Sequence, residues 1–408
     1  MAPSPTPPKS PVVRPLQYRD LEALEQLWHQ WHPPDPAHGE DATRLQWIQR
    51  WYWPLTAMHW FPHPWQLVNH IYVAEYGAEQ QGKAGQGLQG MIQVAPFNHG
   101  RSTWRIDQVL ATGGVGFNGG LSLAGEAGSQ LLRHCLEKIW EARTWIVDAD
   151  VNDKEHLALY RQNGFQPLAQ VTRWLLRPEV LQGLAEREMA VPNLLPVNNA
   201  DAYLLYQLDT VSMPPLLRQV FDRHVADFQT SVLDGLVQQG QNWFSPYVSV
   251  RKYVFEPQRK AAIGSFHLCL SKTGSQPHKA KLTVHPAYTF LYPQLLNHMA
   301  QLTQAYPPQG LCLKSADYQP EREAFLEQVQ ADRLDHVLLM SRSVWHKLRE
   351  QKGVSLEGLQ LSEVLQGLQP SHNPVPGRFV PHSRRELWYA MPEQKTSPPQ
   401  PPSSGDPE

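Results

Sequence analysis

The chain has 408 residues, enough for two ordinary globular domains of roughly 100–200 residues each. Its 36 basic and 38 acidic residues nearly cancel, so the composition provides no general attraction to nucleic acid or to an anionic membrane. The cysteines, Cys135, Cys269 and Cys312, lie far apart, as expected for thiols in a reducing compartment and not for a disulfide framework. Because no apolar run approaches the roughly 20 residues of a membrane span and the N-terminus lacks a signal-peptide core, we expect a cytoplasmic protein.

Periodicity predicts alternating strands and helices between two disordered, Pro- and Ser-rich tails, residues 1–11 and 392–408. In chain order, the first half should contain a strand at 12–16, a helix capped by Asp20, a Trp-rich segment at 47–65, strands at 68–75, 88–94 and 105–111, a glycine-rich loop at 112–120, a helix near 128–140, and strands at 145–150 and 168–176. A helical linker should follow at 178–193, and the second half should repeat the outline with strands at 248–254, 261–270, 279–284, 311–315 and 337–341 and a helix at 291–305.

Two short patterns could indicate other chemistry, and both are weak. Residues 114–119, GVGFNG, match a dinucleotide-binding glycine triplet, but no helix begins inside them, so we interpret them as a loop. His59 and His63 have the spacing of metal ligands on a helix, but Pro62 and Pro64 break that helix and no third ligand stands out. We therefore expect no metal site.

The most informative stretch is Asn152 to Phe165, NDKEHLALYRQNGF. Leu157, Tyr160 and Arg161 recur at helical spacing and should share one face of a short helix. Asn163-Gly164 should end this helix, because glycine tolerates the left-handed conformation of a helix cap. A strand should follow.

Two echoes indicate that the halves arose by tandem duplication. Pro15, Asp20, Leu24, Gln26 and Leu27 are matched 181 residues later by Pro196, Asp201, Leu205, Gln207 and Leu208. Gly128–Ile139, GSQLLRHCLEKI, resembles Tyr292–Thr303, YPQLLNHMAQLT, at an offset of 164 residues. The same order of both echoes, with offsets that differ by insertions, favours two diverged copies of one fold.

The pattern in residues 152–165 resembles the last conserved motif of the GNAT acyltransferases, which usually move an acetyl group from acetyl-CoA to an amine. The order of expected elements is also that of the GNAT fold. The resemblance implies an α/β protein with two tandem acyl-CoA N-acyltransferase-like lobes, each a mixed central sheet flanked by helices. It covers residues 12–177 well and 194–349 loosely, and it leaves out 350–391.

By this resemblance, the coenzyme should bind the first lobe. Its pantetheine should pair with the strand at Val109, Leu110 and Ala111, Asn152 should bind its backbone or simply cap a helix, and its pyrophosphate should lie at a helix N-terminus with the amides of Gly125, Ala127, Gly128 and Ser129. The family's glycine-rich turn reads LAGEAGS here, with Glu126 in place of a glycine. Either Glu126 repels phosphate, or the turn slips by one residue and Glu126 points to solvent. The matching FLYPQLL of the second half has no glycine, so we expect a degenerate lobe without coenzyme.

The catalytic candidates are Tyr160, Glu75 and Asp107. The resemblance implies that Tyr160 protonates the leaving thiolate, whereas the alternative is a core tyrosine. Glu75 and Asp107 are candidates for a general base that acts on the amine through water. We expect an N-acetyltransferase for a small-molecule or peptide amine. The alternative is a non-catalytic GNAT-like regulatory or scaffold protein that has lost coenzyme binding, as Glu126 and the second half would allow.

Overall fold

The computed structural model describes residues 11–31, 70–75, 88–111, 126–187, 189–229 and 246–344. The elements of the first half are β1 (Val12–Pro15), η1 (Tyr18–Asp20), α1 (Leu21–Trp31), β2 (His70–Glu75), β3 (Leu88–Pro96), β4 (Thr103–Ala111), α3 (Glu126–Lys138), β5 (Thr144–Asp150), α4 (Lys154–Gln162) and β6 (Gln166–Leu176). Those that follow are α5 (Pro178–Ala185), β7 (Leu194–Pro196), η4 (Asn199–Asp201), α6 (Ala202–Ser212), α7 (Pro215–Phe221), η5 (Val225–Phe228), β8 (Tyr247–Glu256), β9 (Ala261–Ser271), β10 (His278–Val284), η6 (Pro286–Tyr288), α9 (Leu291–Thr303), β11 (Leu311–Ala316), α10 (Pro320–Gln328) and β12 (Asp332–Ser343). None of these helices is long and apolar enough to cross a membrane.

Several segments for which the sequence made a prediction are not among the described residues. The Trp-rich segment with His59 and His63, the glycine-rich loop at 112–120, Gly125 and residues 350–391 lie outside the described residues. Among the described residues, no group of three or more His, Cys, Asp or Glu side chains could hold a metal ion.

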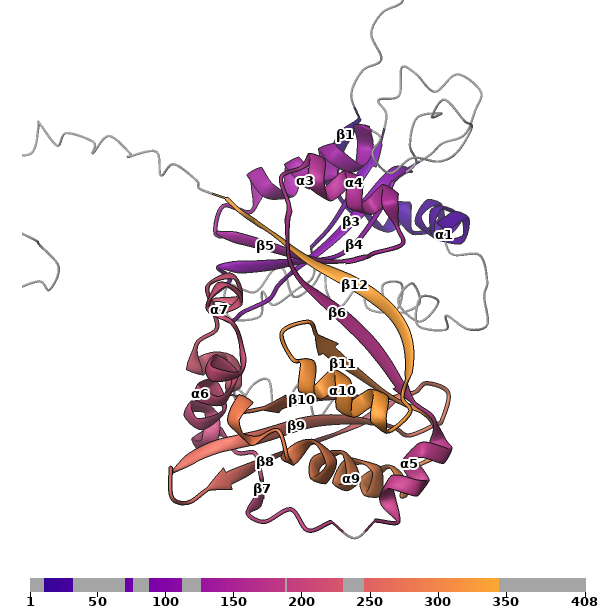
Figure 1. Cartoon of the computed structure of the whole chain (residues 1–408). Coiled ribbons are helices and arrows are strands. Elements are labelled where there is room, and N and C mark those ends of the chain that lie inside the picture. Colours follow the sequence, from indigo (N-terminus) through magenta and orange to yellow (C-terminus); the bar gives the residue numbers. More distant parts are fainter. Residues whose placement is uncertain are drawn as a thin grey trace, which may run out of the picture. The chain divides into compact units, whose positions relative to one another are not determined.

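All strands join one mixed 12-stranded sheet in the order β1-β2-β3-β4-β5-β12-β6-β11-β10-β9-β8-β7. The last strand of each half pairs with the other half: β12 lies between β5 and β6, and β6 lies between β12 and β11 (Figure 1). We expected a separate central sheet in each lobe. The structure joins them instead, because β6 and β12 pair antiparallel at the centre. We call β1–β5 with α1, α3 and α4 the first lobe, and β7–β11 with α6, α7, α9 and α10 the second lobe.

The order of the strands agrees with the predicted duplication. The strands β1 to β6 of the first half and β7 to β12 of the second half occupy the same places when they are counted from the two opposite edges of the sheet. The first echo lies at equivalent places. The Asp20 carboxylate accepts from the amide of Gln17 at 2.8 Å, and the Asp201 carboxylate accepts from the amide of Asn198 at 2.8 Å. Each aspartate thus closes the turn between the first strand and first helix of its half.

The second echo lies on α3 and α9, where two consecutive leucines are buried in each helix: Leu131, Leu132, Leu295 and Leu296. The structure adds a pair that the sequence did not indicate. Gly90 in β3 and Gly264 in β9 lie under these helices, and a β-carbon on either would come within about 3.1 Å of Leu131 or Leu295. These two glycines provide a common reference for comparing the lobes.

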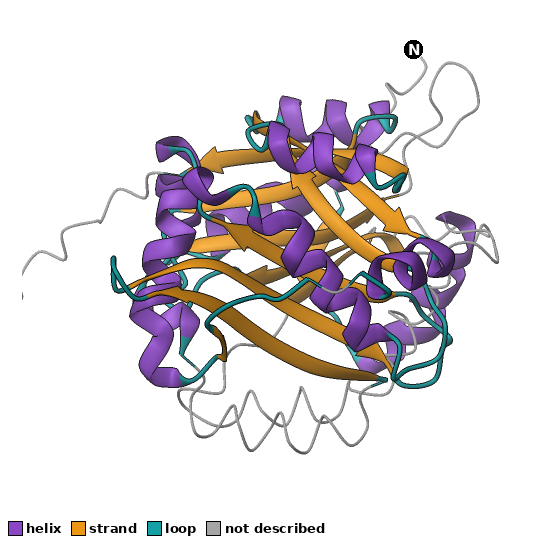
Figure 2. Cartoon of the chain, turned by 60° about the horizontal axis from the view of Figure 1, so that its bottom comes forward, coloured by secondary structure: helices purple, strands orange, loops and turns teal. Residues whose placement is uncertain are grey.

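Helices cover both faces of the sheet (Figure 2). On one face, which we call the front, α3 and α4 pack over the first lobe, and α5, α9 and α10 pack over the second lobe. The opposite face, which we call the back, carries smaller apolar clusters formed with α1, α6 and α7. Trp104 and Trp145 are fully buried in the front core of the first lobe, with their ring centroids 5.9 Å apart.

The predicted helix between Asn152 and Asn163 is α4. The expected stop is confirmed: Asn163 is the C-cap, and Gly164 has a φ of 79°, which glycine adopts readily. Leu157 and Tyr160 are buried, and Arg161, in the last turn of the helix, is exposed. The core therefore covers the part of the predicted face that carries Leu157 and Tyr160.

Candidate active site

β4 and β5 separate at one end, where a site can form. They pair in parallel from Thr103–Thr144 to Ile106–Val147, and both strands continue beyond the last pair without pairing to each other. A β-bulge lies at this point, because Ile106 faces Val94 and Gln108 faces Gln93, which leaves Asp107 as an extra residue. Since a bulge bends its strand, it directs β4 away from β5. We call the space between residues 107–111 and 148–150 the first opening.

Backbone groups of Val109 face this opening. The Val109 carbonyl accepts a hydrogen bond from Nε2 of His156, on α4, at 3.1 Å. The Leu110 carbonyl points the other way, toward β3, and lies 2.7 Å from where a β-carbon on Gly90 would be. Because the N–H and C=O of a strand residue point to the same side and alternate along the strand, the amides of Val109 and Ala111 also face the opening. Leu110, predicted with them, faces β3.

His156 is held as a cation at the mouth of the opening. Its Nδ1 bonds to the carboxylate of Asp153, which also accepts from the His156 amide at 3.0 Å and so caps α4. Burial disfavours the charged imidazole, but the hydrogen bonds to Asp153 and Val109 outweigh burial and raise its pKa. Both partner atoms are acceptors, so both ring nitrogens carry hydrogens.

The predicted phosphate-binding residues lie in the first turn of α3. This helix begins at Glu126, so the amides of Ala127, Gly128 and Ser129 are among the first four, which have no acceptor within the helix. Ala127 and Gly128 are buried. The Ser129 hydroxyl accepts from Nδ2 of Asn163 at 3.3 Å, which connects this turn to the end of α4. Gly125 and the side chain of Glu126 lie outside the described part of the chain, so both versions of the turn stay predictions.

Tyr160 follows His156 by one helical turn, and their ring centroids are 6.1 Å apart. It is 3% exposed and packs edge-on against Phe165 at 5.7 Å. Burial raises the pKa of its hydroxyl, so the hydroxyl keeps its proton. The geometry therefore presents two protic side chains, an imidazolium and a phenol, on the same helix beside the first opening.

Asn152 does not cap α4, so the simpler of its two interpretations was wrong. Asp153 is the N-cap, because its carboxylate reaches the amide of His156. The Asn152 amide instead donates to the carboxylate of Asp150 at 2.8 Å, in the turn after β5. Its role toward a coenzyme stays a prediction.

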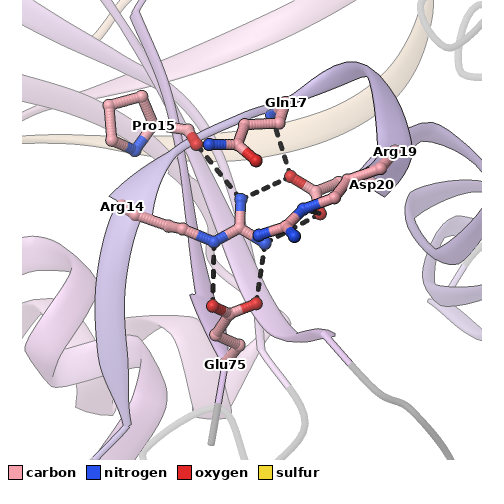
Figure 3. A network of polar contacts seen from close by, with 6 residues as sticks. All are labelled: Arg14, Pro15, Gln17, Arg19, Asp20 and Glu75. Atoms are coloured by element: carbon pink, nitrogen blue, oxygen red, sulfur yellow. Dashed lines mark hydrogen bonds and ion pairs between the residues drawn. The ribbon is translucent and has the colours of Figure 1, made fainter. Parts of the chain in front are cut away.

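Glu75 is tied into an ionic network at the end of β2 (Figure 3). Its two oxygens accept from Nε and Nη2 of Arg14 at 2.9 and 2.7 Å, and Arg14 also contacts Asp20 at 2.5 Å. The hydrogen bond from Arg14 lowers the pKa of Glu75, which makes this carboxylate a weaker base. Asp107, the other candidate base, lies at the bulge of β4 and accepts from Nε of Arg105 at 2.5 Å.

Comparison with known structures identifies this fold. A tandem GNAT protein from the clavulanic acid biosynthesis pathway, solved without AcCoA, is similar with a TM-score of 0.50 and 14% identity over 83% of this chain and 99% of that one. The chain has the tandem GNAT fold. A GCN5-related N-acetyltransferase from Sphaerobacter thermophilus matches with a TM-score of 0.47 and 9% identity over 83% and 97% of the two chains. No protein-family model and no curated protein matches the sequence.

The second GNAT lobe has an equivalent opening, and an arginine closes it. β10 and β11 pair in parallel only at His278–Leu311 and Lys279–Cys312. Beyond these pairs, Arg322 of α10 donates from Nη2 to the carbonyl of Leu282 at 2.8 Å and from Nη1 to the carbonyl of Lys314 at 3.2 Å. Its guanidinium therefore connects the two separated strands.

Arg322 and His156 occupy the same place in the two lobes. Each is the third residue of its helix, α10 or α4. The residues that accept from them, Val109 and Leu282, are also equivalent. Each pairs with the residue two positions after the reference glycine of its lobe, Gly90 or Gly264. Thus the same carbonyl accepts from a basic side chain in both lobes, and Arg322 also reaches the neighbouring strand.

The rest of the second GNAT site is filled by side chains. Tyr292, which aligns with Gly128, stacks on Phe325 at 6.4 Å and lies 5.5 Å from the Arg322 guanidinium. Leu326 stands where α4 has Tyr160, as the seventh residue of its helix. The remaining cavity is about 10 Å³, room for about one water. These side chains occupy the second lobe where α3 has its glycine, and the expected lack of coenzyme binding there stays a prediction.

The sequence analysis missed His156, Asp153 and Arg322. One signal for the first two was available, because an Asp followed three residues later by His at a predicted helix start can form a cap. For Arg322 no local signal exists, since its acceptors, Leu282 and Lys314, lie on two strands that only the fold brings together.

Proposed function

We propose that the protein is an acyl-CoA-dependent N-acyltransferase whose first lobe binds acetyl-CoA. One observation carries this proposal: the first opening presents the backbone of Val109 beside α4, whereas Arg322 closes its counterpart. The amides of Val109 and Ala111 would pair with pantetheine, and those of Ala127, Gly128 and Ser129 would hold the pyrophosphate. These residues fit the coenzyme through their backbone groups, which need no particular side chains.

In the proposed reaction, the neutral amine attacks the thioester carbonyl, and the C–S bond breaks as the amide forms. One of the two amides that face the opening, those of Val109 and Ala111, would stabilise the developing oxyanion while the other stays paired with pantetheine, because both are fixed by the strand. Tyr160 would protonate the leaving thiolate, with His156 as the second proton donor one turn away. Asp107 would accept the amine proton through water, since Arg14 occupies both oxygens of Glu75.

The acceptor would be a small-molecule or peptide amine. A charged amine cannot attack, so the acceptor must lose a proton before or during bond formation, which is the reason for assigning a base. Asp107 lies at the end of the opening where β4 and β5 separate, so it is the carboxylate placed beside the start of the opening.

Calorimetric titration of the full chain with acetyl-CoA tests the proposal directly. We expect one binding site per chain, and we expect the variant His156→Arg, which imitates Arg322, to bind more weakly. A chain that takes up no acetyl-CoA would contradict the proposal and favour the non-catalytic alternative, for which Glu126 at the start of α3 is the specific observation.

A further inference from the structure

Three basic side chains lie directly opposite one another on the back face of the second lobe. Arg251 of β8 faces His267 of β9, and His267 faces Lys281 of β10. We call these residues the basic row. Side chains opposite each other on antiparallel strands have β-carbons about 4.5–5.5 Å apart, and like charges in such positions are destabilising.

The fold itself does not require these charges. The equivalent positions of the first lobe, found by counting from the reference glycines and the paired strands, hold Ile71, Gln93 and Gln108. These three residues face one another in the same way, and none is charged. The two lobes thus share a backbone here and differ in charge.

The surroundings of Lys281 add positive charge instead of balancing it. Arg223, Arg251 and Arg322 all act on Lys281, against a single carboxylate, that of Asp209. That carboxylate is already engaged, because both of its oxygens lie 3.1 Å from Nη1 of Arg223. Among the described residues, no acidic side chain forms an ion pair with Arg251 or Lys281.

The side chain of Lys281 is exposed to solvent. Desolvation by the surrounding protein, followed by Arg223, lowers its pKa to about 8. α6 lies beside the basic row, and its Leu208 packs on Tyr253 and Ala262 of the neighbouring strands.

Arg223, just after α7, is held in place by three contacts. Its guanidinium lies 5.0 Å from the ring of Phe97 and 5.6 Å from that of Phe221, and it also pairs with Asp209. In the middle of the basic row, His267 is kept neutral, since burial and then Arg251 lower its pKa to about 4. Its Nε2 lies 2.8 Å from the hydroxyl of Ser249.

We propose that the basic row binds a small anionic ligand through a carboxylate or phosphate group. Three neighbouring strands, about 4.8 Å apart, spread the row over about 10 Å, which suits one or two such groups. The row lies five strands from β4 in the sheet, about 24 Å at the same spacing. It is therefore a site separate from the first opening, and it does not depend on acyl transfer.

Calorimetric titration of the full chain with inorganic phosphate, and separately with succinate, at pH 7 and low chloride tests this site. We expect saturable binding of one anion per chain, weakened about 10–100-fold by Lys281→Gln or Arg251→Gln, the usual effect of losing a charge-assisted hydrogen bond. Lys281→Arg, which keeps the charge, should retain binding. Lys138→Gln removes an exposed cation of α3 and should change nothing. Binding of only one of the two probes would assign the natural group as phosphate or carboxylate.

Thermal melting of the ligand-free proteins provides the second readout. Lys281→Gln should raise the melting temperature, because it relieves repulsion from Arg223, Arg251 and Arg322, while it weakens anion binding. A residue with a merely structural role would show the opposite change in stability. The proposal is overturned if neither anion binds saturably, if Lys138→Gln weakens binding as much as Lys281→Gln, or if Lys281→Gln lowers the melting temperature and leaves binding unchanged.

Discussion

The two openings of the sheet lie at equivalent places in the two lobes and differ in the side chain that enters them. In the first lobe, where a bulge bends β4, His156 bonds to the Val109 carbonyl and to the carboxylate of Asp153. In the second lobe, Arg322 donates to carbonyls on both separated strands and connects them. The two side chains occupy the same third position of their helices, so one residue distinguishes the two openings.

The two lobes also differ at two further equivalent positions. The first lobe keeps a glycine in the first turn of α3 and a tyrosine on α4, whereas the second lobe has Tyr292 and Leu326. In the second lobe the Arg322 guanidinium lies 5.5 Å from the ring of Tyr292, and the cavity beside them is only about 10 Å³.

The largest effect should come from removing the arginine that closes the second opening. Arg322→Leu removes the donor from the buried carbonyl of Leu282 and from the partly buried bond to the carbonyl of Lys314. An unsatisfied buried acceptor costs about 1–3 kcal/mol, so the free energy of unfolding should fall by about 1–4 kcal/mol. Chemical denaturation measures this loss, and Arg133→Leu, on the exposed side of α3, is the control. A loss below about 1 kcal/mol would mean that water replaces the guanidinium at little cost.

Tyr160→Phe tests the chemistry of the first opening, since it removes only the hydroxyl. If that hydroxyl protonates the thiolate, kcat should fall about 10–1000-fold while KM for acetyl-CoA stays the same. Steady-state kinetics with an identified acceptor measures both constants. The matched variant Tyr253→Phe, which loses a 2.9 Å bond to Asp201 in the second lobe, should keep its rate. An unchanged rate in Tyr160→Phe would leave the tyrosine as a core residue.

His156→Arg should convert the first opening toward the second. The new guanidinium can reach the carbonyls of Val109 and Asp148, which are equivalent to those of Leu282 and Lys314, so acetyl-CoA binding should weaken about 10–100-fold. Calorimetry compares this variant with His156→Gln, which cannot bridge the strands. If the two variants bind equally well, bridging is not what excludes the coenzyme.

The His156–Asp153 pair should make the stability of the first lobe depend on pH, whereas Arg322, at the equivalent place in the second lobe, keeps its charge. Hydrogen bonding raises the pKa of His156 against the effect of burial, so its contribution is complete below about 6.5 and is lost as pH rises through the folded value. Asp153 has a lowered pKa, so its contribution is lost as pH falls below about 4. The melting temperature of wild type minus that of His156→Gln should therefore be largest between these values. A difference that does not vary with pH would contradict a charged pair.

The smallest effect concerns Glu126 at the start of α3. Its charge opposes a pyrophosphate at the same helix end, and such terminal charges are worth about 0.3–1 kcal/mol. Glu126→Gln should therefore tighten acetyl-CoA binding about 2–5-fold by calorimetry. Weaker binding in this variant would show that the turn is aligned incorrectly.

Local chemistry determined much of the fold from the sequence. The periodicity of α4 and its glycine stop needed no tertiary contact, because helix spacing and a left-handed cap are properties of short segments. The same is true of the two echoes, in which Asp20 and Asp201 close identical turns. The residues of the first opening could also be named, since the GNAT resemblance places them by motif.

Only the tertiary structure decided how the halves combine and what their sites contain. The exchange of β6 and β12 depends on pairing between strands more than 150 residues apart, which no local pattern specifies. Long-range contacts likewise revealed the ion pair of Glu75 with Arg14, the closure by Arg322, and the basic row. The local sequence does not distinguish any of these residues from other surface or strand residues. They interact only because the sheet brings distant segments of the chain together.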